Sequence, residues 1–369
     1  MIRLSKSVVG KAEAEAVAHV IEDIGYLGMG AVVGEFEHQL EDYIGGGRRA
    51  ICVNSGTAAL HLAVQAVTRP GDEVLVPSFT FVASYQAITA AGCRPVSCDI
   101  RRDTLTLDLK DAERRITPKT TAMMPVYYAS NCCMAEEYQA FAREHGLRLI
   151  EDAAHAFGCT CNGKKIGSTG DIVCFSFDGI KNITTGEGGA IFTADEEVIQ
   201  KVSDARLLGV QKDSEKRYSG QRSWNFDVVD QGYRYHMSNI FAAIGKVQLS
   251  RFEGEFSPRR RSIARRYTEL LKDTPHVQLT PMDYTNEVTP HIFALQILGG
   301  KRQLLEQKLK ELDIQYGIQY APNHHLTYFR EDVELTVTDE VYSQIISLPM
   351  HPELTDENII QICNIINSL

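Results

Sequence analysis

Residues 49–67 read RAICVNSGTAALHLAVQAV, and this stretch joins two patterns of hydrophobicity through a short polar turn. Residues 49–53 form a short apolar run of the kind seen in buried strands, whereas residues 57–67 place apolar side chains at helical spacing. The turn between them reads NSG, and such residues commonly end one element and begin the next. The stretch therefore predicts a strand followed directly by a helix.

The same alternation of apolar runs and helical segments continues toward the middle of the chain. Further apolar runs are found at residues 72–78, 94–100, 121–128, 147–152, 171–177 and 188–194. Segments with helical spacing, among them residues 81–92 and 133–146, separate several of these runs. Strands that are apolar throughout need cover on both faces, which is typical of a mostly parallel sheet between layers of helices. The predicted fold class is therefore α/β.

The pattern changes after about residue 245, which indicates a second unit. Helices are predicted there at residues 259–273, 301–316 and 356–369, with a strand at residues 291–298. A chain of 369 residues is long enough for about two domains. We therefore predict a large α/β domain over residues 1–245 and a smaller α+β domain over residues 246–369, joined through a helix near residues 239–252.

Composition excludes several classes of protein. The formal net charge of -10 argues against a protein that coats nucleic acid or an anionic membrane. The nine cysteines are scattered without zinc-ribbon spacing, so we expect reduced thiols and no metal. We see neither a signal peptide nor roughly 18 uninterrupted apolar residues. These observations predict a cytoplasmic protein without a membrane anchor.

A run of arginines falls within the predicted helix at residues 259–273: Arg259, Arg260, Arg261, Arg265 and Arg266. Such a run could bind a polyanion, but a solvated helix face is its commoner role and suits the acidic total. We therefore expect these five side chains to face solvent.

The turn at residues 54–57 is the first candidate binding site. Backbone N–H groups and the positive end of the helix dipole can bind an anion where a strand passes into a helix, and Gly56 allows close approach. The turn is no Walker loop, because no lysine follows the glycine. A simple Ser or Thr helix cap is the commoner explanation. The glycines at residues 25–34 follow a helical pattern, which disfavours a dinucleotide fingerprint.

Two further candidates follow apolar strands. Asp152 ends the run at residues 147–152, with His155 three residues later, and Lys181 follows the run that contains Ser176. Ligands of open α/β sheets bind at the carboxyl ends of the strands. Alone, Asp152 would more commonly cap a helix, and a loop lysine is usually solvated.

The three candidates together match the needs of pyridoxal phosphate. Its phosphate suits a helix N-terminus, its pyridine nitrogen needs a carboxylate that keeps it protonated, and its aldehyde needs a lysine for a Schiff base. The order along the chain is a phosphate loop, then an aspartate, then a lysine. That order raises three weak signals to one fairly strong signal.

Over essentially its whole length the chain resembles the DegT family of nucleotide-sugar aminotransferases, which are fold-type-I pyridoxal phosphate enzymes. The stretches that carry the resemblance are GYLGMGAVVGEFEHQLEDYIGG, VNSGTAALHLAV, GDEVLVPSFTFVAS, LIEDAAHAFG, GDIVCFSFDGIKNITTGEGGAIFT, GYRYHMSNIFAAIGKVQL and SLPMHPELTDENI. The resemblance implies a large domain with a mostly parallel central sheet and a smaller C-terminal α+β domain.

The resemblance also implies roles for individual residues. Lys181 matches the Schiff-base lysine and Asp152 the residue that faces the pyridine nitrogen. His155 stands where the family often has glutamine near the ring hydroxyl, and Phe81 matches the aromatic residue that packs on the ring. The phosphate contacts of the family correspond to Gly56, Thr57 and Ser176. Positions near the sugar substrate correspond to Gly28, Met29 and His324.

The family completes each active site with the second subunit of a homodimer, through a segment that reads GYRYHM here, residues 232–237. Arg234 stands where the family usually has asparagine, and His236 where it usually has arginine. We expect Arg234 to bind the phosphate, because its charge suits a dianion. Asp178 replaces a frequent histidine, and YYASNC at residues 127–132 replaces a histidine-and-glycine turn. These departures predict an altered sugar pocket.

The resemblance implies a ping-pong transaminase whose amino donor is L-glutamate. Its acceptor would be a nucleotide-diphospho-keto-deoxy-sugar, for surface polysaccharide such as the O-antigen of lipopolysaccharide or a related glycoconjugate. Residues 184–189, TTGEGG, resemble the branch that aminates 4-keto-6-deoxy-sugars, such as the perosamine synthases. The alternatives are a 3-keto-sugar aminotransferase, a sugar dehydratase and a non-catalytic sensor that binds pyridoxal phosphate. Known dehydratases of the family carry histidine in place of the lysine, and sensors usually carry a DNA-binding segment.

Overall fold

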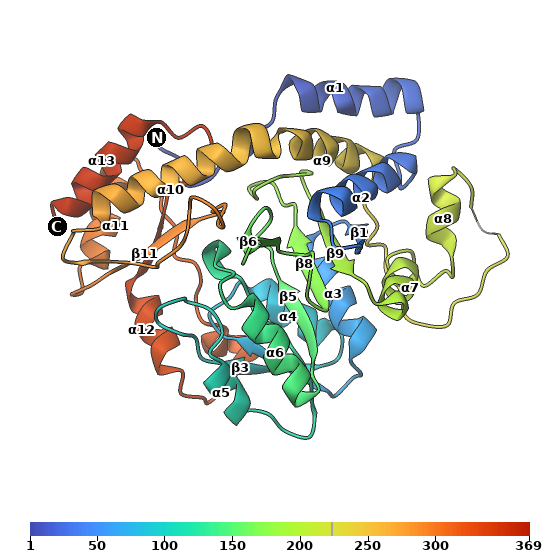
Figure 1. The fold of residues 1–369 in the computed structure, drawn as a ribbon, viewed down its shortest axis with the longest axis horizontal. Coiled ribbons are helices and arrows are strands. Elements are labelled where there is room, and N and C mark those ends of the chain that lie inside the picture. The colour runs from blue at the N-terminus through green and yellow to red at the C-terminus, as the bar shows by residue number, and fades with distance from the viewer. Residues whose placement is uncertain (223) are drawn as a thin grey trace.

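A seven-stranded sheet forms the centre of the large unit in the computed structural model, which describes residues 1–222 and 224–369 (Figure 1). The strand order is β1-β9-β8-β5-β4-β2-β3, and only β9 runs antiparallel to its neighbours among these strands. The strand bounds are β1 (Arg49–Val53), β2 (Glu73–Pro77), β3 (Arg94–Cys98), β4 (Thr120–Met123), β5 (Arg148–Asp152), β8 (Ile172–Ser176) and β9 (Gly189–Thr193). The predicted α/β fold with a mostly parallel sheet is confirmed.

Both faces of this sheet are buried, as the continuous apolar runs require. Leu149 and Val173 contribute to a core on one face, whereas Ile150 and Ile172 contribute to a core on the other. The first core also contains side chains from α2 (Ala31–Ile44) and α6 (Ala135–His145). The second contains side chains from α3 (Gly56–Val67), α4 (Val82–Ala90) and α7 (Glu196–Ala205).

The smaller unit is built on an antiparallel sheet in the order β10-β11-β12. Its strands are β10 (Val277–Leu279), β11 (Phe293–Ile297) and β12 (Ile345–Leu348). The helices that accompany it are α10 (Ser257–Leu271), α11 (Arg302–Glu311), α12 (Thr336–Gln344) and α13 (Asp356–Asn367). The remaining α-helices are α1 (Lys11–His19), α5 (Leu109–Arg114), α8 (Asp213–Tyr218) and α9 (Asn239–Arg251).

One long helical path links the two units. In Figure 1, α9 and α10 run on from one another across the upper part of the molecule, with α1 above α9, and a π-helical turn at Phe252–Phe256 joins them. The predicted division between residues 245 and 246 falls inside α9 and stays a prediction. Within the described residues, no helix has both the length and the apolar composition needed to cross a membrane.

Two details differ from the expected elements. The helix expected at residues 301–316 ends at Glu311, because Asp313 turns the chain with φ +54° so that Ile314 can pair with Ile2. A small hairpin of β6 (Thr160–Cys161) and β7 (Lys164–Lys165) was not predicted. Its turn is Asn162–Gly163 with positive φ at both residues, a recognised hairpin signal.

Candidate active site

Sheet topology brings the predicted cofactor residues to one edge of the large sheet. Asp152 ends β5 and pairs with Cys174 of the parallel strand β8, which ends at Ser176. Gly189 of β9 pairs with Ser176 on one side and with Val53, the last residue of β1, on the other. The carboxyl ends of β1, β5 and β8 therefore lie at the same edge.

The N-terminus of α3 meets the end of β8 at very close range. A Cβ atom added at Gly56 would lie 2.7 Å from Cβ of Ser176, so glycine is required there by packing. Ser55 caps the helix by accepting a hydrogen bond from the Ala58 backbone N–H at 3.1 Å. The helix-cap interpretation therefore holds for Ser55. The first turn, which includes Thr57, still presents N–H groups without helical acceptors beside Ser176.

Asp152 is a buried carboxylate held by two donors. Its Oδ2 accepts a hydrogen bond from Ser84 Oγ at 2.8 Å, and its Oδ1 accepts one from the Ala154 backbone N–H at 3.1 Å. Burial raises the pKa of Asp152 above its usual value, while these two donors and the charge of Lys181 oppose the rise. A cation placed near this carboxylate would bring the pKa down and be stabilised in return.

Lys181 is not the solvated loop lysine of the simpler interpretation. The side chain is partly buried, and its Nζ lies 3.4 Å from Nε2 of His291. Desolvation lowers the pKa of Lys181 to about 8, against the opposing pull of Asp152 and Asp178. At this pKa roughly a tenth of the amine is neutral at pH 7, far more than for an ordinary lysine, so the amine can act as a nucleophile or proton carrier.

Two buried imidazoles lie together beside Lys181, and we call His155 and His291 the buried histidine pair. Their ring centroids are 4.5 Å apart. Burial lowers the pKa of both rings, and the charge of Lys181 lowers each of them further. Both rings are therefore neutral near pH 7. Their Nδ1 atoms are buried and have no hydrogen-bond partner, so each is free for a bound molecule.

Aromatic side chains continue the wall formed by the buried histidine pair. Tyr320 Oη lies 3.2 Å from Nε2 of His155, and the Tyr320 ring lies 5.3 Å from the Phe81 ring between centroids. Phe81 is 53% exposed, so its ring face is open to a ligand. A flat ring could stack against such a wall while its polar atoms meet the histidines.

The turn that departs from the family pattern supports the buried histidine pair. Ser130 Oγ donates a hydrogen bond to the backbone carbonyl of His155 and accepts one from the backbone N–H of His291 at 2.9 Å. The backbone turns there with φ +51° at Ala129 and φ +72° at Ser130. Residues 127–132 thus fix the spacing between two histidines that come from opposite units of the chain.

The expectation that the arginine run faces solvent is wrong for Arg260. This side chain is 2% exposed and donates to the backbone carbonyls of Pro290, His291 and Lys181 at 3.2, 3.2 and 3.4 Å. Desolvation lowers the pKa of Arg260 to about 10. The prediction is wrong here because one face of this helix packs between the two units. The arginine on that face donates hydrogen bonds to backbone carbonyls instead of facing solvent.

The other predicted residues contact different parts of the chain, and Arg234 borders the turn at residues 54–57. Arg234 is exposed, and its backbone carbonyl accepts a hydrogen bond from the Asn54 side chain at 3.3 Å. Met29 is buried in the core, and the Gly28 carbonyl accepts a hydrogen bond from the Asn239 backbone N–H at 3.0 Å. Nδ1 of His324 lies 2.7 Å from Oγ of Ser78, which belongs to the loop that follows β2. Roles for these residues in binding stay predictions.

Sequence reasoning missed His291, Tyr320 and Ser84. Ser84 is the last residue of the stretch GDEVLVPSFTFVAS, which carries part of the resemblance. By its sequence alone it is an ordinary residue of the predicted helix. His291 is the first residue of the apolar run at residues 291–298, which contains β11. A histidine at the start of a predicted strand is the one signal that could have drawn attention to it. Tyr320 carries no sequence signal that we can identify.

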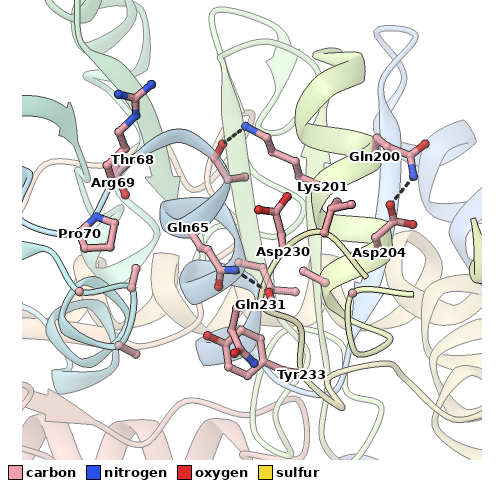
Figure 2. Close-up of a pocket in the computed structure, with 18 of the residues that line it drawn as sticks. Gln65, Thr68, Arg69, Pro70, Gln200, Lys201, Asp204, Asp230, Gln231 and Tyr233 are labelled. Carbon is pink, nitrogen blue, oxygen red and sulfur yellow. Dashed lines mark hydrogen bonds between the residues drawn. The ribbon is translucent and has the colours of Figure 1, made fainter. Parts of the chain in front are cut away.

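A cavity of about 680 Å³ lies away from this cluster, around the other end of α3. Figure 2 shows Gln65 donating to the Gln231 carbonyl and Lys201 reaching a backbone carbonyl, which is that of Ala66. None of the predicted site residues lines this cavity. Size alone therefore does not mark the chemically equipped site of this chain.

The residues at the sheet edge fit pyridoxal phosphate. The glycine-dependent cradle between α3 and β8 suits a phosphate, the buried Asp152 suits a pyridinium, and the desolvated Lys181 suits an aldehyde. The unpartnered Nδ1 of His155 and the open face of Phe81 are available to the ring.

Comparisons with known proteins agree with this fit. The profile of the DegT/DnrJ/EryC1/StrS aminotransferase family matches residues 8–367. The dTDP-4-dehydro-2,3,6-trideoxy-D-glucose 4-aminotransferase of Saccharopolyspora spinosa is 35% identical, over 97% of this chain and 94% of that protein. The spore coat polysaccharide biosynthesis protein SpsC of Bacillus subtilis (strain 168) is 34% identical, over 96% of this chain and 93% of that protein.

A solved structure extends the agreement to the cofactor. Spr1654 of Streptococcus pneumoniae, named as a sugar aminotransferase, is 29% identical in its PLP form, with a TM-score of 0.88. The match covers 100% of this chain and 98% of that one, and the same protein has also been solved in a PMP form. The chain therefore belongs to the DegT/DnrJ/EryC1/StrS family and is a sugar aminotransferase that depends on pyridoxal phosphate.

Proposed function

We propose that this enzyme transfers the amino group of L-glutamate to the C4 keto group of a 4-keto-6-deoxy-hexose linked to a nucleoside diphosphate. The observation that carries the proposal is the meeting of Lys181, Asp152 and the Gly56 cradle at one sheet edge. Pyridoxal phosphate, when bound, supplies an aldehyde that carries the amino group and a ring that withdraws electrons.

Lys181 is the proposed proton carrier of the reaction. Its lowered pKa of about 8 would let the amine accept a proton from a carbon atom of the substrate and later donate a proton again. His291 accepts a hydrogen bond from Nζ at 3.4 Å and so directs the amine within the site. Arg260 holds the backbone of Lys181 in place by donating a hydrogen bond to its carbonyl.

Asp152 is proposed to hold a proton on the ring nitrogen of the cofactor. Because this carboxylate is buried, a neighbouring cation would stabilise its charged form. Ser84 and Ala154 fix the direction of its two oxygens. His155, neutral and backed by Tyr320, is proposed to face the ring hydroxyl. Gly56, Thr57 and Ser176 are proposed to bind the phosphate.

The assignment of C4 rests on two supports. One curated relative carries 4-aminotransferase in its name, and it covers nearly the whole chain. The TTGEGG segment follows Lys181 directly, and its threonines 184 and 185 are buried, with Thr184 Oγ1 accepting from the Gly186 backbone N–H at 2.8 Å. A rigid segment next to the reacting amine can fix how a sugar presents one carbonyl.

Matched 3-keto and 4-keto nucleotide sugars, each offered with isotopically labelled glutamate, test this proposal. We expect the label to appear on C4 of the 4-keto compound, located by NMR, while the 3-keto compound stays inert. Amination at C3 would favour the 3-keto alternative. Absence of transfer to either compound, with cofactor bound, would contradict the proposed substrate.

We also propose a homodimer with shared sites. Five large apolar side chains are exposed in the part of the chain before the GYRYHM segment: Leu208, Trp224, Phe226, Val228 and Val229. Exposed large apolar side chains concentrated in one part of the chain suit contact with a second copy of the chain. Burial and nearby arginines lower the pKa of His236 to about 4, so Arg234 is the cation that this segment offers to a partner's phosphate. Mixing Lys181→Ala with Arg234→Ala subunits should restore activity in hybrid dimers.

The cellular setting follows from the proposed product. We propose that the enzyme acts in the cytoplasm, where nucleotide sugars are made, and supplies an amino sugar for O-antigen of lipopolysaccharide or a related surface glycoconjugate. The likeness to a spore coat polysaccharide biosynthesis protein supports a polysaccharide role. Loss of one amino sugar from the surface polysaccharide of a deletion strain would test this setting.

A further inference from the structure

Two neighbouring histidines and an aspartate meet on the small unit, where it contacts the loop that follows β2. His324 and His325 lie in a short 3-10 turn (Asn323–His325), and Asp339 lies on α12. One ligand atom from each residue lies within 4.8 Å of the others. We call these three residues the surface triad. The expectation that the chain binds no metal considered cysteine spacing, and this triad contains no cysteine.

His324 is the buried member of the surface triad. Its side chain is 2% exposed, and its Nδ1 lies 2.7 Å from Ser78 Oγ. Its Nε2 is buried without a hydrogen-bond partner and faces Asp339 Oδ1 at 3.5 Å. A histidine whose one nitrogen is fixed by a neighbour and whose other nitrogen is free has the arrangement common in metal ligands.

An ordinary ion pair explains only part of this arrangement. His325 Nε2 lies 2.7 Å from Asp339 Oδ1, and these side chains are 55% and 45% exposed. A pair exposed to this extent adds little to stability. Nε2 of His324 lies 3.5 Å from the same Oδ1 and makes no hydrogen bond, which is costly for a buried nitrogen.

We propose that the surface triad binds a divalent transition-metal cation of the zinc type, through Nε2 of His324, Nε2 of His325 and a carboxylate oxygen of Asp339. Tetrahedral zinc with bonds of about 2.0–2.1 Å places its ligand atoms roughly 3.4 Å apart. The 3.5 Å separation between His324 and Asp339 matches that spacing. The 2.7 Å separation between His325 and Asp339 must widen, which their exposure permits. A fourth position is left for water.

A cation in this position would tie α12 to the loop that follows β2. Asn323, next to His324, donates from its side chain to the backbone carbonyls of Ser78 at 3.0 Å and Thr80 at 2.8 Å. That loop leads directly to Phe81 at the active site. Metal binding should therefore stabilise the folded chain and restrain this loop. The inference goes beyond the proposed transaminase reaction and does not depend on it.

The test uses the full-length enzyme loaded with pyridoxal phosphate and freed of metal by a chelator. Zinc is titrated in competition with a chromophoric chelator, and cobalt(II) is added separately to record its visible spectrum. We expect one tight equivalent, a spectrum of nitrogen and oxygen ligands, and a rise in Tm with zinc. His325→Asn and Asp339→Asn should each weaken binding by at least about tenfold.

His19→Asn is the matched control. His19 also lies 2.6 Å from a carboxylate, that of Asp23, and is exposed, but this pair lies outside the surface triad. The control should bind zinc as the wild type does. Equal affinity in wild type, His325→Asn and Asp339→Asn would overturn the proposal. Strong sulfur-to-cobalt absorption that survives in His325→Asn would also overturn it, because the metal would then be bound by cysteine.

Discussion

The enzyme contains two pairs of adjacent imidazoles, and their surroundings give them different chemistry. The rings of the buried histidine pair lie 4.5 Å apart and face the amine of Lys181, whereas those of His324 and His325 lie 3.9 Å apart and face the carboxylate of Asp339. A neighbouring amine disfavours added positive charge, whereas a carboxylate favours it. The same side chain is therefore suited to a neutral wall for a cofactor in one place and to cation binding in the other.

The largest effect is expected from removing the amine that the buried histidine pair faces. Lys181→Ala should lower turnover by on the order of a thousandfold or more, because the residue both binds the cofactor aldehyde and carries the proton. Steady-state transfer from glutamate to the keto-sugar measures the loss. Lys165→Ala is the matched control, since burial also lowers the pKa of Lys165, but its Nζ contacts Tyr43. A Lys181→Ala enzyme with wild-type turnover would contradict the assignment.

The next effect concerns the charge opposite that amine. Asp152→Asn should keep the fold and the cofactor but lose on the order of a hundredfold in kcat, because an amide cannot stabilise a pyridinium by charge. Ser84→Ala removes only a donor to Oδ2 and should cost roughly tenfold. Comparable losses in both variants would mean that orientation, not charge, is what Asp152 contributes.

The residues around Lys181 show how far sequence reasoning reaches. Asp152 and Ser176 end apolar strands and Gly56 follows one, and the sheet brings these positions to one edge, as their places in the sequence predict. Their roles stay predictions. His291 lies 110 positions beyond Lys181 in the chain and reaches it only through the packing of the small unit. No local pattern encodes that meeting.

The arginine run teaches the same lesson from the opposite direction. Its helical spacing correctly predicts a helix, α10, but spacing alone does not say which face of the helix is buried against the rest of the protein. Arg260 is buried because the carbonyls of residues 181, 290 and 291 converge on it from two units. Burial decided by a distant partner is invisible to periodicity.

A smaller effect is expected within the buried histidine pair itself. His291→Leu removes the acceptor for Lys181 and should lower kcat roughly tenfold with little change in KM, because the amine is less well directed. Loss of this hydrogen bond should also shift the acidic limb of the pH profile of kcat. His291→Gln, which retains an acceptor, should recover part of the rate.

His276→Asn serves as the control for that experiment. His276 is another partly buried histidine of the small unit, and its Nε2 lies 2.8 Å from the Ile366 carbonyl. It should leave the pH profile unchanged. If His291→Leu and His276→Asn gave the same profile as wild type, His291 would be a packing residue without influence on Lys181.

The smallest effect is expected on stability in mild acid, where the two imidazole pairs should differ. Burial lowers the pKa of His155 and His291 from about 6.5, so the unfolded chain binds more protons than the folded chain just below that pH. The free energy of unfolding should therefore rise with pH in this window and fall as the pH drops below 6.5. His291→Leu should flatten this slope, because one of the two rings that resist protonation is gone. His325→Asn, in metal-free protein, is the matched variant in the other imidazole pair, and its ring is 55% exposed. Urea unfolding at pH 5.0, 6.0 and 7.0, roughly spanning the window, measures the three slopes. Equal slopes in wild type and His291→Leu would mean that the buried pair accepts protons without cost, and the contrast between the two pairs would then fail.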